Sequence, residues 1–311
     1  MGEVTMDLGA DDAVEAILRG GLAREARALT AVVPVLRHLL GSEAQGLVSE
    51  AILARVRGMI LDLAAQLLAA QTGRDPAARA PGADPAALDA LAESLMGEEV
   101  LLAHCHALAT ESLVADRLQQ RHAIDPVLSP LLQELIAAED PAVAALAMTT
   151  LAAQSRFIQS QRRMELPLGE LPAELFHALL PRAHRHGGDN AGLSRLQASY
   201  DEATSRLGLL ARLVAGMRRG AVAALALDHA GLALFASALA SETRSPRGEA
   251  VLAAQEGQGV RLALMLRAAG LAVPAIERQL GLAEPAALLP PAIGALTAAR
   301  AAALLAAGRA A

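Results

Sequence analysis

The segment PRAHRHGGDN, residues 181–190, has the residue types that most resemble a site of metal or hydrolytic chemistry. In an extended chain the imidazoles of His184 and His186 would point to one side, with Asp189 following as a third ligand. In a helix the two histidines would lie about 200° apart and could not share an ion. Histidine suits the negative end of a helix, glycine suits its left-handed cap, and Asp189 can cap the next helix. The sequence therefore favours a helix end, and a metal-dependent enzyme that uses these three residues, with His177 as a further candidate, is the alternative.

A second cluster consists of His104, Cys105 and His106, which are consecutive in the sequence. On a helix these three side chains fan out over about 200°, so they cannot converge on one ion. Cys105 shares an apolar stripe with Leu101 and Leu108, which predicts that it packs in the core as a small apolar residue. We interpret this cluster as packing rather than as a metal site.

A third group of polar residues lies within residues 151–172, LAAQSRFIQSQRRMELPLGELP. Arg156, Gln159 and Arg163 share one face of the predicted helix, and Arg162 lies beside them at its end. Guanidinium and amide groups in this arrangement can hold a carboxylate or a phosphate through paired hydrogen bonds. A merely solvated face is the alternative, because charged helix faces usually indicate only exposure. These four residues are the candidate binding residues.

Common catalytic and cofactor motifs are absent from the sequence. It contains no Gly-rich phosphate loop, no Gly-x-Ser-x-Gly elbow, no His-Glu-x-x-His and no Cys-x-x-Cys. The sequence therefore predicts no catalytic activity, no cofactor and no bound metal.

The elements that must position these residues are predicted to be helices. Aromatic residues make up 1% of the chain, and the apolar residues are mainly Ala and Leu, whereas strands favour β-branched and aromatic residues. Apolar residues recur at spacings of three and four, which indicates an all-α multi-helix bundle. The stretch LLQELIAAEDPAVAALAMTTLAAQSRF has the helix, Asp-Pro turn, helix pattern of stacked repeats, but no copy follows at a fixed period. A bundle and a partial solenoid both stay open.

Start and stop signals predict individual helices. Pro34 is expected to kink or restart the first helix, and Ser42 is expected to cap the second. The inward stripe of the second helix is predicted to be Leu47, Ala51, Ala54, Gly58, Leu61, Ala65 and Leu68. Further helices are predicted from 85 through 95 and over 98–123, 126–138, 141–165, 172–186, 190–218, 220–241, 247–269 and 273–280.

The predicted domain organisation follows the order of the chain. Residues 73–84 are rich in Pro and Gly and read as a linker between an N-terminal helical unit, 1–72, and a main helical domain, 85–281. Residues 282–311 form an Ala-rich tail. Because a short isolated helix is marginally stable, the order of the tail depends on docking to the body or to a partner.

Composition also predicts the compartment and excludes some partners. Cys105 is the only cysteine, so no intrachain disulfide can form, and residues 1–17 lack the basic start and apolar core of a secretory signal. A cytoplasmic location follows, and no charge-free apolar stretch is long enough to span a bilayer. The net charge of -6 without any basic block argues against nucleic acid as a partner. All 27 basic residues are arginine, which together with the abundant alanine suggests a bacterial source with a GC-rich genome.

Two stretches carry a family resemblance. Residues 121–180, RHAIDPVLSPLLQELIAAEDPAV and onward, and residues 232–271, LALFASALASETRSPRGEAVLAAQEGQGVRLALMLRAAGL, resemble the alphaproteobacterial family called domain of unknown function 2336. Its later segment typically has a Leu-Phe pair, here Leu234-Phe235, and ends in Arg-Ala-Ala-Gly-Leu, here 267–271. The resemblance covers residues 100–275. It implies a helical fold with some repeat character and no established activity or catalytic residue.

These observations predict a cytoplasmic helical scaffold or adaptor that acts through protein–protein contacts and forms a homo-oligomer. Amphipathic helices throughout the chain, the missing catalytic motifs and the Ala-rich tail support this prediction. Two alternatives stay open. One is the metal-dependent enzyme at His184, His186 and Asp189, and the other is a ligand-sensing helical domain with a pocket near Arg156 and Arg163.

Overall fold

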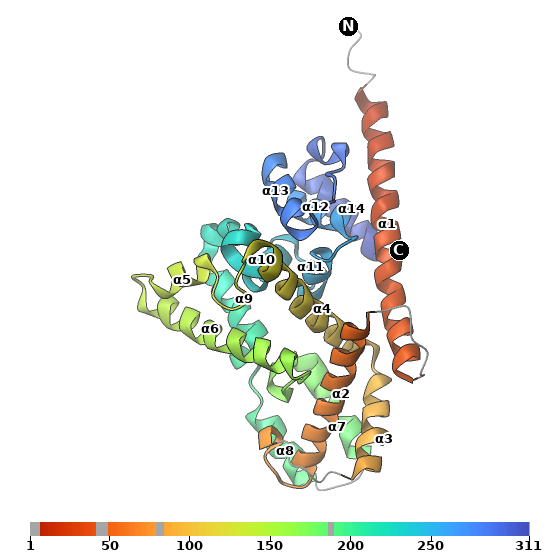
Figure 1. Ribbon diagram of the computed structural model, residues 1–311, viewed down its shortest axis with the longest axis vertical. Helices are drawn as coiled ribbons and strands as arrows, with labels where there is room; N and C mark the ends of the chain where they lie inside the picture. Colours follow the sequence, from red (N-terminus) through yellow and green to blue (C-terminus); the bar gives the residue numbers. More distant parts are fainter. Residues whose placement is uncertain (1–6, 42–48, 79–83, 186–189, 311) are drawn as a thin grey trace. The chain divides into compact units, whose positions relative to one another are not determined.

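The computed structural model describes residues 7–41, 49–78, 84–185 and 190–310. Within these ranges every regular element is a helix and no strand occurs, which confirms the predicted all-α class (Figure 1). None of the helices in these ranges combines the length and the apolar content that a membrane crossing requires.

The chain folds into two compact units, each assembled from segments that are distant in the sequence. Unit 1 comprises Met1–Ala31, Leu113–Ala138 and Val214–Ala311, and unit 2 comprises Val32–Ser112 and Glu139–Leu213. Three of the four divisions fall inside helices, α1 (Asp7–Gly41), α4 (Glu99–His122) and α9 (Arg206–Met217), and the fourth lies between residues 138 and 139. The sequence-based division at residues 72, 84 and 281 stays a prediction.

Helix α2 (Glu50–Gln71) is the centre of much of the packing in unit 2. Besides α2 and parts of α1, α4 and α9, this unit contains α3 (Pro85–Met96), α6 (Pro141–Arg162), α7 (Ala173–Arg185) and α8 (Asn190–Ser199). α3, α7 and α8 all contact α2 (Figure 1). The helices predicted to begin at residues 85 and 141 do begin there: Asp84 caps α3 by accepting from Ala86 N, and Asp140 caps α6 by accepting from Ala142 N.

The inward face of α2 differs from the predicted one. None of the six predicted residues from Ala51 to Leu68 is buried, whereas Ile52, Val56, Leu63 and Leu67 are. Alanine recurs so often in this helix that helical spacing alone is satisfied in several rotations, and the rotation that buries the larger branched side chains removes more apolar area from water. The N-cap is Ser49, whose side chain accepts from Ile52 N, and the predicted cap, Ser42, and Leu47 lie outside the described residues.

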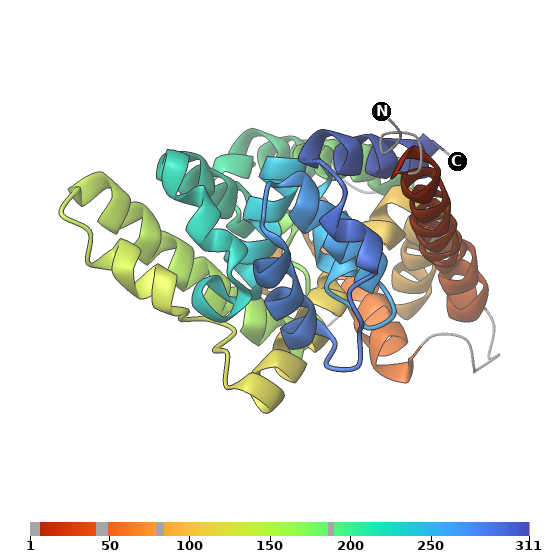
Figure 2. The ribbon, with the colours of Figure 1, turned by 90° about the horizontal axis from the view of Figure 1, so that it is seen from above.

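Unit 1 contains the C-terminal helices and the predicted tail. Its helices are α5 (Pro130–Ile136), α10 (Leu227–Thr243), α11 (Arg247–Ala253), α12 (Gly259–Ala268), α13 (Val273–Ala283) and α14 (Ala298–Ala310), with the first part of α1 and the last parts of α4 and α9. α14 packs on α12, so the tail docks within the chain. Figure 2 shows the blue helices of this C-terminal part of unit 1 together. Leu304 and Leu305 are both buried there. Glu25 of α1 accepts from the backbone N–H groups of Val260 and Arg261 at the start of α12.

Several helix boundaries differ from those predicted. α1 continues through Pro34. Asp125 does not start a helix, because its Oδ1 accepts from Val127 N at 2.7 Å and closes a turn, and α5 begins only after the cap Ser129. The long helices predicted over 190–218 and 247–269 are each two helices, and the second pair is separated by a turn in which Gly257 has a φ of 82°.

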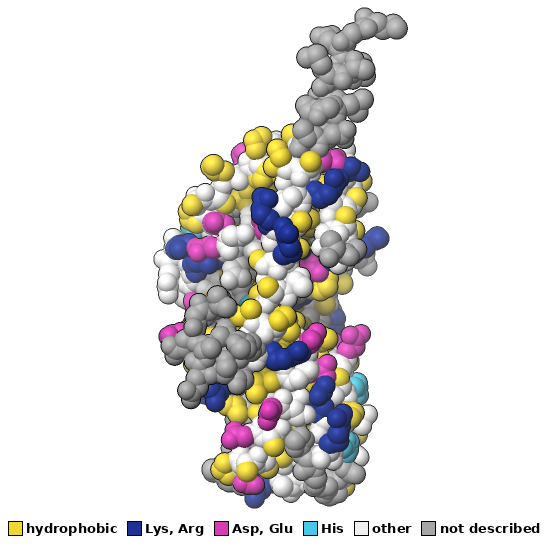
Figure 3. Space-filling view, turned by 90° about the vertical axis from the view of Figure 1, so that its right-hand side faces the viewer, with side chains coloured by type: hydrophobic (Ala, Val, Ile, Leu, Met, Phe, Trp, Pro, Cys, Tyr) yellow, Lys and Arg dark blue, Asp and Glu magenta, His cyan; other side chains and the backbone are white. Residues whose placement is uncertain are grey.

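The face drawn in Figure 3 carries both signs of charge. In the face drawn in Figure 3, arginine side chains alternate with acidic ones and with apolar side chains. The described part of this face therefore has no continuous block of one sign.

Candidate ligand-binding site on helix α6

Arg156, Gln159 and Arg163 share one face of α6, as predicted, and all three are exposed. The opposite side of the helix is buried through Ala153, Phe157 and Gln161. These positions follow from helical spacing, because residues three, four and seven apart share a face.

The chain reverses its direction directly after α6. Arg163 is the C-cap, and Met164 has a φ of 59° and is 39% exposed. Glu165 N donates to Ser160 O at 2.8 Å, which closes the reversal of the chain. α2 approaches this reversal closely, since a Cβ added to Gly58 would lie 2.5 Å from Met164 Cβ. A larger residue at position 58 would push the reversal away.

The exposed face of α6 borders a pocket with a volume of about 330 Å³, which lies entirely within unit 2. Three of the four predicted binding residues line it, namely Arg156, Gln159 and Arg163, while Arg162 is exposed but does not belong to the lining. The other lining residues are Leu108, Phe157, Ser160, Gln161, Glu165, Leu166, Pro167, Glu170, Arg206 and Leu207. The pocket thus combines cationic, polar and apolar groups.

The two arginines of the α6 face are uncommitted. Within the described residues, neither Arg156 nor Arg163 forms a side-chain hydrogen bond or an ion pair. Both side chains are exposed, so their guanidinium groups stay hydrated and can bind an anion without first breaking an internal contact.

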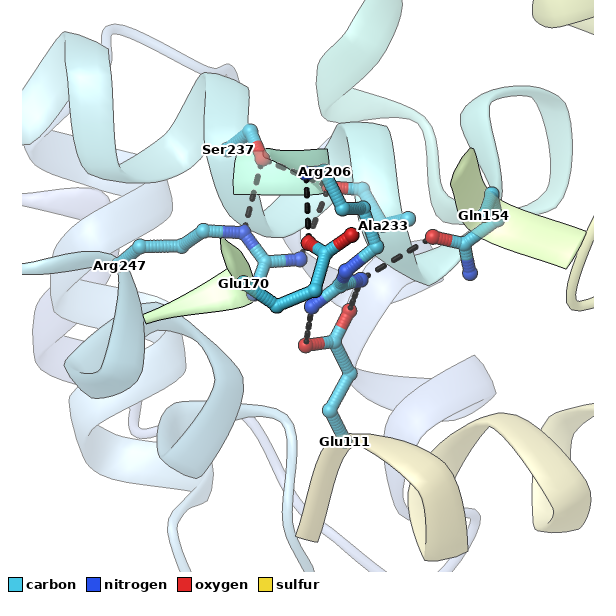
Figure 4. A network of polar contacts seen from close by, with 7 residues as sticks. All are labelled: Glu111, Gln154, Glu170, Arg206, Ala233, Ser237 and Arg247. Carbon is cyan, nitrogen blue, oxygen red and sulfur yellow. Dashed lines mark hydrogen bonds and ion pairs between the residues drawn. The ribbon is translucent and has the colours of Figure 1, made fainter. Parts of the chain in front are cut away.

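A third arginine of the pocket, Arg206 at the start of α9, is committed to the core. It is 1% exposed, and its Nη1 and Nη2 donate to Glu111 Oε1 and Oε2 at 2.8 and 2.9 Å (Figure 4). Nη1 also donates to Gln154 Oε1 at 3.0 Å, and the guanidinium lies 3.6 Å from the centroid of the Phe157 ring. Arg206 therefore ties α9 to α4 and α6 and supports the floor of the pocket.

Glu170 adds a carboxylate to the lining. Its Oε2 accepts from Arg206 N at 2.7 Å (Figure 4). Within the described residues no hydrogen bond to its Oε1 is found. Burial raises the pKa of Glu170, while the hydrogen bond from Arg206 N and the positive charges of Arg206 and Arg156 oppose that rise. Arg156 is therefore close enough to Glu170 for their charges to interact.

The segment that carries Glu170 is held in place by α2. Gln66 of α2 is buried, and its Nε2 donates to Leu166 O at 2.9 Å while its Oε1 accepts from Leu168 N at 2.9 Å. Asp62 accepts from Leu166 N at 2.8 Å. These contacts fix the backbone after α6, so the pocket wall is preorganised.

Gln161 is a second acceptor of the lining without a donor. It is 1% exposed, and its Nε2 lies 3.3 Å from Met59 Sδ and 3.4 Å from Glu165 O. Its Oε1 is buried without a hydrogen-bond partner among the described residues. A buried amide oxygen normally has a donor.

The histidine segments stand apart from this pocket. His184 is exposed near the end of α7, and His186 and Asp189 lie outside the described residues. His177 packs edge-on against Phe176, with ring centroids 5.3 Å apart. In the described part of the chain, no three His, Cys, Asp or Glu side chains are grouped so as to hold a metal ion.

The His-Cys-His segment of α4 packs in unit 2. Cys105 is fully buried, as predicted, and burial raises its pKa to about 12. His106 is buried as well, and burial lowers its pKa to about 4. Its imidazole is therefore neutral at pH 7.

The sequence analysis identified the exposed arginines of the pocket. It did not identify the hydrogen-bond acceptors Glu170 and Gln161, or Arg206, which supports the pocket floor. Arg206 meets Glu111 across 95 positions and Glu170 across 36. No local spacing connects residues so far apart, so only the fold brings them together.

The fold and the site define an all-α protein with an arginine-lined pocket. Comparison of the chain with protein-family models, with curated proteins and with solved structures gives no match. The resemblance described from the sequence stays an expectation and supplies no site residue.

Proposed function

We propose that this chain is a non-catalytic helical binding protein, and that unit 2 binds a small anionic molecule in the α6 pocket. The observation that carries the proposal is the pair of uncommitted arginines, Arg156 and Arg163, on one side of a pocket of about 330 Å³. This volume lies at the lower end of the range of roughly 300–1,000 Å³ found for ligand pockets.

The spacing of the polar groups suits an anion. Arg156 and Arg163 are two helical turns apart, so their Cα atoms are separated by about 10 Å along the axis, and Gln159 lies between them on the same face. The long arginine side chains can converge on one anion or hold two anionic groups of one molecule. A planar guanidinium pairs with a carboxylate or a phosphate through two parallel hydrogen bonds.

The apolar part of the lining supports an organic ligand over a simple ion. Phe157, Leu166 and Leu207 contribute carbon surface beside the charged groups. Ligand pockets typically combine such surface with a few polar groups that fix orientation. This proposal corresponds to the ligand-sensing alternative of the sequence analysis.

The scaffold function and the homo-oligomer stay predictions. One support for them is weaker than expected, because Leu304 and Leu305 of the tail are buried within the chain. The tail therefore satisfies its need for a docking surface on α12. Light scattering of the full chain would measure its oligomeric state directly.

The proposal is tested by titrating the full chain with inorganic phosphate and with small mono-, di- and tricarboxylates in a calorimeter. Arg163→Ala and Arg156→Ala are expected to weaken binding by tenfold or more, since a hydrogen bond between charged groups contributes about 1.5–3 kcal/mol. Arg162→Ala is the matched control, because this exposed arginine lies on the same helix and does not line the pocket.

Two results would contradict the proposal. One is that none of these anions binds the wild-type chain. The other is that Arg162→Ala weakens binding as much as Arg163→Ala, since the effect would then reflect general charge and not the pocket.

A further inference from the structure

We infer that the ligand of the α6 pocket is an amino acid or a hydroxy acid, whose acidic group meets Arg156 and Arg163 and whose ammonium or hydroxyl group donates to Glu170. This inference rests on the proposed function and specifies the chemistry of its ligand.

The pocket offers hydrogen-bond acceptors as well as cations. Glu170 Oε1 and Gln161 Oε1 both belong to lining residues, and neither has a donor among the described residues. Removing a carboxylate or amide oxygen from water without giving it a donor is unfavourable. A ligand that brings a donor to this part of the pocket would relieve that cost at Gln161 Oε1, which is buried without a partner, and its donor could also reach Glu170.

Charge selects the same class of ligand. A molecule with only anionic groups would place a negative charge beside the carboxylate of Glu170, and like charges that are partly buried repel strongly. A hydroxyl group avoids this repulsion, and an ammonium group replaces it with attraction.

The two kinds of group are close enough for one small molecule. Arg156, Arg163 and Glu170 all line the same pocket of about 330 Å³, so the anion-binding end and the acceptor share one small cavity. Glu170 is also fixed in place by Arg206 N at 2.7 Å, which leaves Oε1 as its available acceptor. The pocket is therefore preorganised for a ligand with an acidic group at one end and a hydrogen-bond donor at the other.

The experiment compares ligands that differ only in the donor. Succinate, malate and aspartate share a four-carbon diacid frame with hydrogen, hydroxyl or ammonium at one carbon, and propionate, lactate and alanine repeat the comparison on a three-carbon monoacid. Calorimetric titration of the full wild-type chain is expected to show the hydroxy or the amino member binding at least tenfold tighter than the plain acid in at least one series.

Glu170→Gln tests the assigned acceptor. The glutamine can keep a carbonyl oxygen for Arg206 N but loses the negative charge, so the preference for the amino member is expected to fall below threefold, while binding of the plain acid stays equal or tightens. Glu174→Gln is the matched control, because it makes the same charge change at an exposed residue of α7 outside the pocket lining.

The outcomes separate this inference from the proposed function. Binding that depends on Arg163 but is equal for plain, hydroxy and amino acids keeps the proposed function and overturns the inference. Absence of binding dependent on Arg163 for every acid and for phosphate overturns both. If Glu170→Gln does not fold, the ligand series on the wild-type chain still decides, because that comparison needs no variant.

Discussion

The buried ion pair between Arg206 and Glu111 is expected to be a major determinant of the stability of unit 2. In the variant Glu111→Leu, the guanidinium would keep its charge but lose two hydrogen bonds of 2.8 and 2.9 Å. Both side chains of the pair are 2% exposed, so water cannot replace the lost acceptor. Removing one partner of a buried pair typically costs about 3–5 kcal/mol of unfolding free energy.

The magnitude can be checked against the individual contacts. Hydrogen bonds between charged groups contribute about 1.5–3 kcal/mol each, so two of them give about 3–6 kcal/mol. Gln154 and the Phe157 ring still contact Arg206 and would retain part of its stabilisation. A loss near 4 kcal/mol would be a large fraction of the 5–15 kcal/mol by which folded domains are typically stable.

Replacing both partners distinguishes the cost of one unpaired buried charge from the contribution of the ion pair itself. The double variant Glu111→Leu, Arg206→Met removes both charges of the pair, and buried pairs replaced by apolar residues are often neutral in stability or better. The double variant is therefore expected to lie within about 2 kcal/mol of the wild-type chain, well above the single variant Glu111→Leu.

The assay is urea unfolding followed by circular dichroism at the helical band. The wild-type chain, Glu111→Leu, Arg206→Met and the double variant form a double-mutant cycle. Arg163→Ala serves as a control, because this exposed arginine has no partner among the described residues, and its effect should stay within about 0.5 kcal/mol. A loss below about 1 kcal/mol in Glu111→Leu, or a double variant no more stable than that single variant, would refute the reasoning.

Acid, glycine packing and the docked tail give the remaining predictions. Burial lowers the pKa of His106 from 6.5 to about 4, so the unfolded chain takes up a proton first as the pH falls, and the unfolding free energy is expected to drop by about 3 kcal/mol across this window. His106→Gln should flatten that part of the urea-derived pH profile, and an unchanged slope would contradict the assignment. A Cβ at Gly192 would lie 1.8 Å from a backbone carbonyl oxygen of α2, so Gly192→Ala is expected to cost at least 1–3 kcal/mol in thermal unfolding. Gly169→Ala, where a Cβ meets no atom within 4 Å, should cost far less. Leu304→Ala removes a side chain that is 3% exposed and should cost about 2–5 kcal/mol, whereas Leu288→Ala, at a residue 90% exposed, should change stability by less than about 0.5 kcal/mol. Equal effects of the last two variants would show that the tail is not docked.

The comparison of α6 with α2 shows where sequence patterns were sufficient. On the last turns of α6 the large apolar Phe157 and the polar residues Arg156 and Gln159 leave one rotation of the helix that separates apolar from polar groups, so the exposed face was predicted correctly. On α2 alanine occupies most faces, and the predicted rotation was wrong. The burial of Ile52 and Val56 was decided by the helices that pack on α2.

Helix boundaries show the same division. The caps Asp84 and Asp140 are local features, because each side chain accepts from a backbone N–H two residues ahead. The turn at Asp125 has the same Asp-Pro signal but no helix follows it directly, and α5 starts at Ser129 instead. Local signals therefore identified where the chain can turn, but not which turn begins a helix.

The sequence by itself determined the all-α class, two of the helix caps and the shared face of Arg156, Gln159 and Arg163. All of these depend on contacts between residues a few positions apart, which helical geometry fixes in advance. Only the tertiary structure decided that this face borders a pocket, that Glu170 joins it and that Arg206 is neutralised in the core. The reason is physical: an arginine can be buried only where a carboxylate meets it, and Glu111 lies 95 positions away along the chain.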